Sequence, residues 1–336
     1  MSAVSLLEVK NLHTYFKTKK GIVKAVNDVT YSLDAGKTLG IVGESGSGKS
    51  VSAMSIIKLL DGNGYIESGS ITFDGKDILQ CTDKEMYHIR GNEISVIFQE
   101  PMTSLNPVFT VERQIGETLQ IHQNMTKKEA RKRAVDLLAD VKIPNPERVA
   151  KQYPFQLSGG MRQRVMIAMA LACKPKLLIA DEPTTALDVT IQAQILKLMN
   201  DLKAQMGTSI LFITHDLGVI HEMADEVAVM YCGQIVEKAP ARTIFHDGTY
   251  SHPYTEGPDD LDSPAEHPKG GKAGRDSRLC AQPPVPAPGL QIRPPVQVLH
   301  QALRGGGASP AGGGARPCGT LFLCGKGGEK RTWRMR

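Results

Sequence analysis

A glycine-rich segment that follows a short apolar run constrains this chain more than any other feature. Residues 43–50 fit the pattern G-x-x-x-x-G-K-[ST], and residues 38–42 before them are largely apolar. Glycines permit backbone conformations in which successive N–H groups converge on phosphate oxygens. A strand, such a loop and a helix in this order predict a nucleotide-phosphate site in an α/β fold.

The chemistry expected of this loop follows from its residue types. Lys49 would neutralise phosphate charge, and Ser50 would offer its hydroxyl to Mg²⁺. A helix expected from about Lys49 to Leu60 would direct its positive end at the same anion. A chance match in a glycine-rich turn is the alternative, and the flanking strand and helix argue against it. The residues expected to bind the nucleotide here are Gly43, Glu44, Ser45, Gly46, Ser47, Gly48, Lys49 and Ser50.

Two acids stand at the end of a second apolar run. Leu177 to Ala180 are followed by Asp181 and Glu182, which predicts a strand that delivers two carboxylates to its tip. In an ATPase with such a loop, Asp181 would hold Mg²⁺, and Glu182 would orient and deprotonate the attacking water. An ordinary strand end with solvated acids is the alternative, and the presence of the glycine-rich loop in the same chain argues against it.

The segment between these two motifs narrows the class. Residues 157–164, Leu-Ser-Gly-Gly-Met-Arg-Gln-Arg, resemble the signature sequence of ATP-binding cassette (ABC) ATPases. Ser158 is expected to cap a helix, and Gly159 and Gly160 let a phosphate approach the backbone. A capped helix after a Gly-Gly turn is the structural alternative. The order and spacing of the three motifs favour the signature.

The resemblance implies roles for four further residues. Gln99 matches the family's Q-loop glutamine, which links Mg²⁺ and the attacking water to a membrane subunit. His215 matches the switch histidine that contacts the γ-phosphate, and Asp188 matches the D-loop that communicates across a dimer. Phe16 stands where the family places an aromatic ring against adenine. Its neighbour Tyr15 remains an alternative, because only the alternation of residues 12, 14 and 16 separates the two.

Within the family, the chain is similar to the first ATPase subunit of oligopeptide and dipeptide importers. The likeness runs from residue 5 to about 256 and rests on residues 40–50, 98–107 and 251–255; Met161 departs from the usual signature glutamine. Nickel importers share these features and remain an alternative. A soluble ABC protein acting on nucleic acid or ribosomes is a second one, and the single cassette argues against it.

Partners and location follow from the same resemblance. We expect a second ABC ATPase subunit, identical or not, two membrane permease subunits and, indirectly, a peptide-binding protein, with no nucleic acid. Each of two composite ATP sites would form when the glycine-rich loop of one cassette meets Ser158 to Gly160 of the other. No apolar run approaches the roughly 20 residues needed to span a bilayer, and the N-terminus has no signal-peptide pattern. The expected location is the cytoplasmic face of the membrane, as a peripheral subunit.

The coarse periodicity predicts an α/β cassette with two subdomains. Short strands at 6–9, 23–25 and 29–33 would form an antiparallel edge, and buried strands at 38–42, 94–98, 177–180, 209–214 and 227–230 a mainly parallel core. Residues 1–99 and 157–256 would make the ATPase core, and 100–156 an inserted helical subdomain. Within it Thr126 and Glu129 predict a capping box, and Pro144 and Pro146 a helix end.

The last 80 residues differ from the rest of the chain in charge and in Gly and Pro content. Residues 1–256 carry 28 Lys and Arg against 29 Asp and Glu, whereas residues 257–336 carry 12 against 6 and hold 26 of the 53 Gly and Pro residues. Such a segment cannot bury enough apolar surface to fold. We expect a disordered or aberrant tail, and Cys280, Cys318 and Cys324 lack the spacing of an iron–sulfur cluster.

Overall fold

Two sheets and a group of helices form the molecule in the computed structural model, which describes residues 5–99, 104–185 and 187–246. The antiparallel sheet has the order β2-β1-β4-β5, and the second sheet has the order β10-β9-β3-β8-β7-β6. In the second sheet β9, β3, β8, β7 and β6 run parallel, and β10 pairs antiparallel with β9. The expected α/β class with an antiparallel edge is confirmed.

The strands are long at the antiparallel edge and short in the parallel core. Their bounds are β1 Ser5–Thr18, β2 Gly21–Asp34, β3 Thr38–Val42, β4 Gly64–Phe73, β5 Lys76–Asp77, β6 Ile94–Ile97, β7 Leu177–Asp181, β8 Ser209–Thr214, β9 Glu226–Tyr231 and β10 Gln234–Pro240. The helices are α1 Lys49–Ile56, α2 Asp83–Ile89, α4 Val111–Gln123, α5 Lys127–Asp140, α6 Pro146–Ala150, the 3₁₀ turn η1 Pro154–Gln156, α7 Gly159–Ala170, α8 Val189–Met206, α9 Leu217–Met223 and α10 Ala241–His246.

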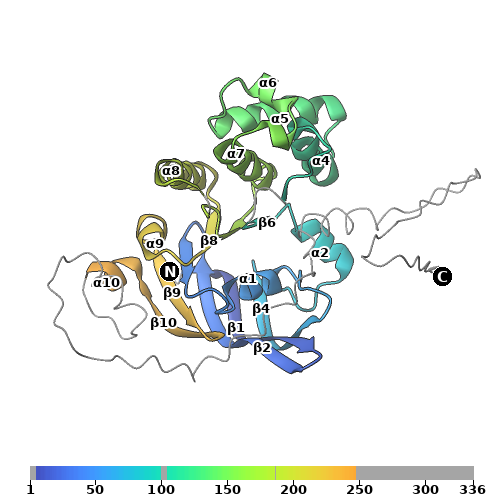
Figure 1. Ribbon diagram of the computed structural model, residues 1–336. Coiled ribbons are helices and arrows are strands. Elements are labelled where there is room, and N and C mark those ends of the chain that lie inside the picture. Colours follow the sequence, from blue (N-terminus) through green and yellow to red (C-terminus); the bar gives the residue numbers. More distant parts are fainter. Residues whose placement is uncertain (1–4, 100–103, 186, 247–336) are drawn as a thin grey trace, which may run out of the picture.

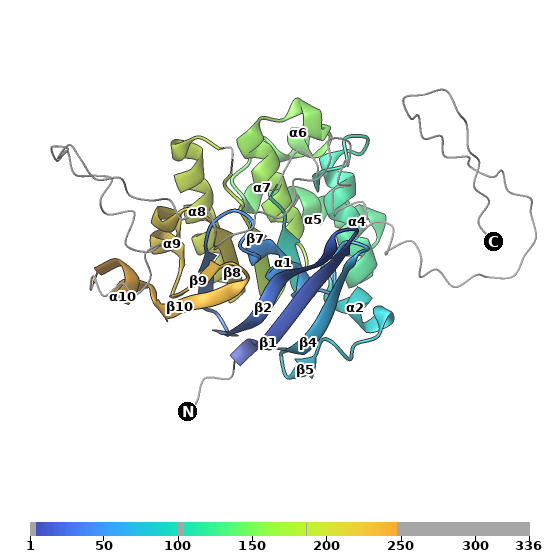
Figure 2. The same ribbon diagram turned by 60° about the horizontal axis from the view of Figure 1, so that its bottom comes forward.

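The parallel sheet separates two hydrophobic cores because its side chains alternate between its faces. Leu177 and Ile179 of β7 pack into the core shared with the antiparallel sheet and α1, whereas Leu178 and Ala180 pack under the helices on the other face. Figures 1 and 2 show α1 beside the antiparallel sheet and α4 to α7 gathered at the opposite end. Continuous apolar runs in the sequence reflect burial on both faces.

Two strands that were expected to be separate form one continuous strand. Val23–Ala25 and Val29–Leu33 belong to the single strand β2, because Asn27 and Asp28 form an irregularity instead of a turn. Asp28 has a φ of 64°, and its carboxylate accepts a hydrogen bond from Asn11 of β1 at 2.8 Å. A bulge of this kind bends a strand without ending it. Strand β4 was not predicted at all.

Three helix ends differ from expectation. Helix α1 ends at Ile56, before Leu60, because Lys58 takes a left-handed φ of 50°. Helix α7 ends at Ala170, whereas the apolar residues after the signature predict a helix that continues to Cys173. Helix α5 already ends at Asp140, and Pro146 begins α6 instead of ending a helix. The capping box of Thr126 and Glu129 is confirmed in both directions, at 2.9 and 3.4 Å.

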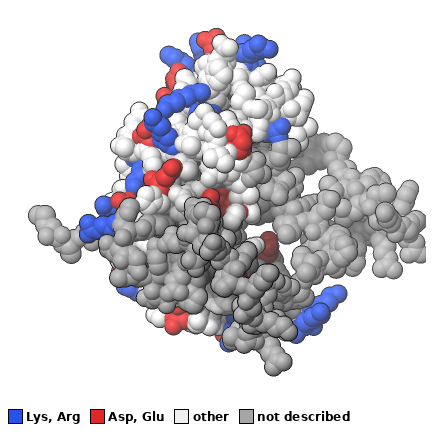
Figure 3. All heavy atoms as spheres, turned by 60° about the vertical axis from the view of Figure 1, so that its left-hand side comes forward, with Lys and Arg blue, Asp and Glu red and all other residues white. Residues whose placement is uncertain are grey.

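The helical end of the molecule packs as one body with the sheet beneath it. Helix α7 contacts α4, α5 and β6, so it joins the segment expected as an inserted subdomain to the core sheet. On the face in Figure 3, the Lys and Arg side chains of this end are interspersed with Asp and Glu. The expected division at 99/100 and 156/157 stays a prediction, and the expected tail at 257–336 lies outside the described residues. Among the residues that are described, no helix has the length and apolar character that crossing a membrane requires.

Candidate nucleotide site

The glycine-rich loop is held between the two sheets. A side chain at Gly43 would overlap the carbonyl oxygen of Met230 in β9, and one at Gly48 would overlap that of Ala25 in β2. Gly48 also takes a φ of 101°, which L side chains rarely adopt. The backbone N–H of Gly233, between β9 and β10, donates to the carbonyl of Ser47 at 2.9 Å. These close approaches explain why residues without side chains occupy the two positions.

The loop encloses polar groups that a phosphate would satisfy. Lys49 is 5% exposed, and its Nζ donates to the carbonyl oxygens of Gly43 at 2.7 Å and Glu44 at 2.8 Å. Burial lowers the pKa of Lys49, while the charges of Glu182, Asp181 and Glu44 oppose that shift. The hydroxyl of Ser47 is buried without a hydrogen-bond partner. A buried ammonium, an unpartnered hydroxyl and a loop with no room for a side chain at Gly43 or Gly48 fit an anionic group.

Two of the three residues expected to bind the metal, Ser50 and Asp181, meet at the start of α1, whereas the third, Gln99, contacts Glu182. The hydroxyl of Ser50 donates to Oδ1 of Asp181 at 2.9 Å. Burial raises the pKa of Asp181 to about 6, and the bond from Ser50 lowers it only in part. Hard oxygen donors of this kind suit Mg²⁺, which commonly takes one or two protein ligands and completes its shell with phosphate and water. Correspondingly, the described part of the chain holds no cluster of three or more His, Cys, Asp or Glu side chains placed to bind a metal.

The carboxylate of Glu182 lies between residues from three strand ends. Glu182 follows β7 and has a φ of 47°. Its backbone N–H donates to the carbonyl oxygen of Ile213 in β8 at 2.9 Å. Oε2 accepts a bond from Nε2 of Gln99, just past β6, at 2.8 Å. Oε1 lies 3.2 Å from Nδ1 of His215, just past β8. The carboxyl ends of neighbouring parallel strands thus bring together the three residues expected to act in catalysis.

Thr185 completes this group and was missed by sequence reasoning. Its hydroxyl donates to Oε2 of Glu182 at 3.0 Å. A hydroxyl three residues after an acid at the end of a strand is a local signal that could have found it, because a turn brings the two side chains to the same side.

The other expected site residues lie elsewhere. Ser158 caps α7 by accepting from Met161 at 3.3 Å, and Asp188 caps α8 by accepting from Ile191 at 3.0 Å. A side chain at Gly160 would lie 3.0 Å from Ile191, so the starts of α7 and α8 are neighbours. Ser158, Gly159 and Asp188 are exposed. Figure 1 shows α7 at the helical end of the molecule, with α1 beside the antiparallel sheet.

Phe16 and Tyr15 contact different parts of the antiparallel sheet. The half-buried ring of Phe16 packs on Gly64 at the start of β4, because a side chain there would lie 2.7 Å from Cε1 of the ring. Tyr15 packs edge to face with Tyr65, and its hydroxyl donates to Asn27 at 3.3 Å. Tyr15 therefore has sheet partners for both its ring and its hydroxyl.

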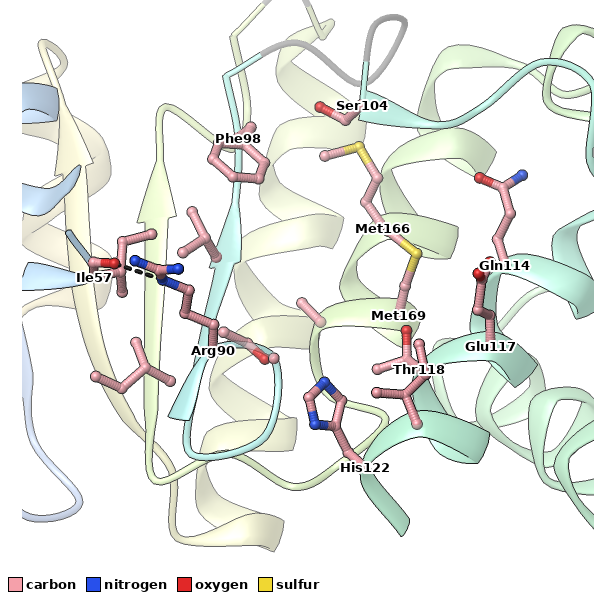
Figure 4. A pocket seen from close by; sticks show the side chains of 16 residues that line it. Ile57, Arg90, Phe98, Ser104, Gln114, Glu117, Thr118, His122, Met166 and Met169 are labelled. Atoms are coloured by element: carbon pink, nitrogen blue, oxygen red, sulfur yellow. Dashed lines mark hydrogen bonds between the residues drawn. The ribbon is translucent and has the colours of Figure 1, made fainter. Parts of the chain in front are cut away.

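A cavity separate from this group of residues lies between the core sheet and the helical end. It has a volume of about 100 Å³, and its lining includes Phe98, which directly precedes Gln99. Figure 4 shows Ile57, Arg90 and Phe98 on one side, with Thr118 and His122 of α4 and Met166 and Met169 of α7 on the other. The guanidinium of Arg90 donates to the carbonyls of Ile57 and Lys58. The lining is mainly apolar and joins both parts of the molecule.

Comparison with known proteins places these motifs in one family. The ABC transporter family matches residues 26–185. The oligopeptide transport ATP-binding protein AppD of Bacillus subtilis is 58% identical over 254 residues, which cover 75% of this chain and 77% of the relative. OppD of Escherichia coli, an oligopeptide transport ATP-binding protein, is 54% identical over 255 residues, which cover 76% of this chain and 75% of the relative.

Solved structures agree with the fold and show its assembly in a relative. The ATP-binding cassette MJ0796, solved as a dimer in a post-hydrolysis state with ADP and Pi, superposes with a TM-score of 0.63 at 31% identity. The match covers 70% of this chain and 99% of that cassette. The likeness therefore extends over the whole length of a complete cassette.

Proposed function

Because this chain belongs to the ABC transporter family, we infer that it is the ATP-hydrolysing subunit of an oligopeptide importer. The assignment of the reacting groups rests on the position of the Glu182 carboxylate. It lies between Gln99 and His215, at the edge of the sheet where Ser50 meets Asp181. Such a group, next to a phosphate-binding loop, is suited to activating water for attack on a terminal phosphoryl group.

The chain's own residues divide the work of binding and proton transfer. Lys49 and the loop N–H groups would hold the phosphates, and Glu182 would accept the proton of the attacking water. Ser50 and Asp181, with Gln99 nearby, would hold Mg²⁺, which supplies neutralisation of charge on the phosphate oxygens. His215 would contact the terminal phosphate, and Phe16 would stack on adenine. Support for these roles comes from the contacts of Lys49, Ser50 and Glu182.

The partner proposal rests on the residues that do not join this group. Ser158, Gly159 and Asp188 are exposed and Gly160 is half-buried, and all four lie at helix starts where a second ABC subunit could meet them. The cassette MJ0796, which was solved as a dimer, supports pairing of two cassettes. We propose that ATP closes two cassettes head to tail and that hydrolysis lets them reopen, which alternates access through two permease subunits fed by a peptide-binding protein. The chain would lie at the cytoplasmic face of the membrane.

The cavity beside Phe98 is the proposed contact for a permease. The cavity is lined by residues of the core sheet and of the helical end, including Phe98, which directly precedes Gln99, the residue expected to sense the nucleotide. An apolar segment of a permease bound there would contact both parts of the molecule. Thr118→Arg in α4 should fill the cavity, abolish co-purification with the permeases and leave ATP binding by the separate chain unchanged. Gln120→Arg, on the exposed side of the same helix, is the control. Normal assembly of the Thr118 variant would contradict the proposed contact.

The deciding experiment measures ATP hydrolysis by the chain assembled with its permeases. Glu182→Gln should retain nucleotide binding and lose turnover by on the order of 10² to 10⁴-fold, as expected when a general base is removed. Glu67→Gln, on the exposed surface of β4, should retain the rate. Turnover within about threefold of wild type in the Glu182 variant would assign the base to another residue. Nickel-complex uptake is the transport alternative, and substrate-stimulated hydrolysis with peptides against nickel complexes separates the two.

A further inference from the structure

We propose that Thr185 is a positioning residue, whose hydroxyl fixes the Glu182 carboxylate and ties it to the segment that leads to Asp188. This inference rests on the proposed function, in which Glu182 activates water. The hydroxyl of Thr185 donates to Oε2 of Glu182 at 3.0 Å, and the side chain of Glu182 is 13% exposed. A charge-assisted bond shielded in part from water is stronger than a neutral, solvated one.

The bond is built into a turn of the backbone. The N–H of Thr185 donates to the carbonyl of Glu182 at 3.2 Å, so the two residues form a short local unit. Because the turn fixes the hydroxyl relative to the residue that carries the carboxylate, little conformational freedom is lost when the side-chain bond forms. Gln99 and His215, in contrast, reach Glu182 from the ends of other strands.

The three side chains that contact the Glu182 carboxylate differ in their other proposed roles. Under the proposed function, Gln99 also serves Mg²⁺ and His215 also contacts the terminal phosphate. Thr185 has no such second role. Its hydroxyl can therefore keep the carboxylate in one orientation while the other two side chains engage the nucleotide, which is what a general base within hydrogen-bond reach of water requires.

The same turn runs toward the proposed cassette interface. The N–H of Leu187 donates to the carbonyl of Thr184 at 3.3 Å, and Asp188 then caps α8. Asp188 and Val189 are exposed at the start of that helix. A shift of this helix start when a second cassette meets it would reach the Glu182 carboxylate through the Thr185 hydroxyl.

The test is Thr185→Val in the assembled transporter, because valine keeps the shape and removes the donor. We expect kcat to fall on the order of tenfold, with KM and ATP affinity within about twofold of wild type, since the bond orients a base and does not bind nucleotide. Thr185→Ser should restore most of the rate. Thr72→Val, a half-buried threonine of β4, should show no loss. A wild-type kcat in Thr185→Val, or a loss that appears in KM alone, would overturn the proposal.

A double-variant cycle separates this inference from the proposed function. In single-turnover measurements, Thr185→Val should add less than about twofold to the loss caused by Glu182→Gln, because both changes act through one carboxylate. A full tenfold addition would show that Thr185 acts by another route. If Glu182→Gln alone retains turnover, the proposed base is wrong. If that variant is inactive and Thr185→Val is normal, only the positioning role fails.

Discussion

The glycine-rich loop and the signature helix differ in how much of their chemistry is complete within one chain. Around the loop, Lys49, Ser50, Asp181 and Glu182 are mostly buried and each has a hydrogen-bond partner from the same chain. At the signature, Ser158 and Gly159 are exposed, and the side-chain bond of Ser158 goes only to its own helix. Under the proposed function, residues that act within the chain are visible in its contacts, whereas residues proposed to act on a neighbour have the contacts of ordinary helix caps.

The comparison is most directly tested by Ser158→Arg, which should show the largest effect. The separate chain should bind ATP normally, because under the proposed function the signature contacts the nucleotide of the partner cassette. In the transporter, bulk and positive charge at the interface should reduce hydrolysis by on the order of a hundredfold or more, similar to the loss of a transition-state contact. Size-exclusion chromatography with ATP measures dimer formation. A variant that still forms ATP-stabilised dimers and hydrolyses ATP would refute the composite site.

Lys49→Ala should produce the opposite result, because its target is inside the chain. A charge-assisted hydrogen bond to phosphate contributes roughly 1.5 to 3 kcal/mol, or about ten- to over a hundredfold in affinity. Calorimetric titration of the separate chain with ATP measures this loss. Lys197→Ala, a substitution in the middle of α8, is the control. Equal losses in the two variants would remove the distinction between the regions.

Asp181 gives the loop side of the comparison a pH dependence. Its pKa of about 6 lies above the unfolded value, so the folded chain binds the proton more tightly, and this group favours folding less as pH rises from about 4 to 6. Without added Mg²⁺ or nucleotide, Asp181→Asn should therefore stabilise the fold at pH 7 by roughly 1 to 3 kcal/mol. The gain should shrink toward pH 4, as denaturant titrations at several pH values would show. A gain independent of pH would contradict burial as the cause.

The smallest expected effect concerns the adenine contact. Phe16→Ala should weaken ATP binding by about two- to tenfold, as loss of one aromatic pair contributes roughly 0.5 to 1.5 kcal/mol. Inorganic triphosphate should bind both forms equally. Tyr15→Ala should leave ATP affinity unchanged, since that ring packs on Tyr65. The reverse result would move the adenine contact to Tyr15.

The sequence predicted most of the parallel core and the place of the glycine-rich loop between β3 and α1, because both rest on local patterns. Apolar runs located β3, β6, β7, β8 and β9 to within a residue at each end. It did not predict that β2 continues through Asn27 and Asp28, because these residues are typical of turns, and their contacts, such as the bond from Asn11 to Asp28, form only when β1 pairs with β2. Thr185 was missed for a similar reason, since its role depends on where the turn places its hydroxyl.

The packing of the glycine-rich loop predicts that the two sheets open together in local unfolding. Gly43 touches β9 and Gly48 touches β2, and the N–H of Asn27 in β2 donates to the carbonyl of Gly233 at 2.8 Å. The two sheets therefore share one loop as their common boundary and cannot separate without distorting it. In amide hydrogen exchange, β2 and β3 should exchange as one cooperative unit, and ATP should slow both by the same factor although the proposed phosphate contacts lie beyond the end of β3 alone.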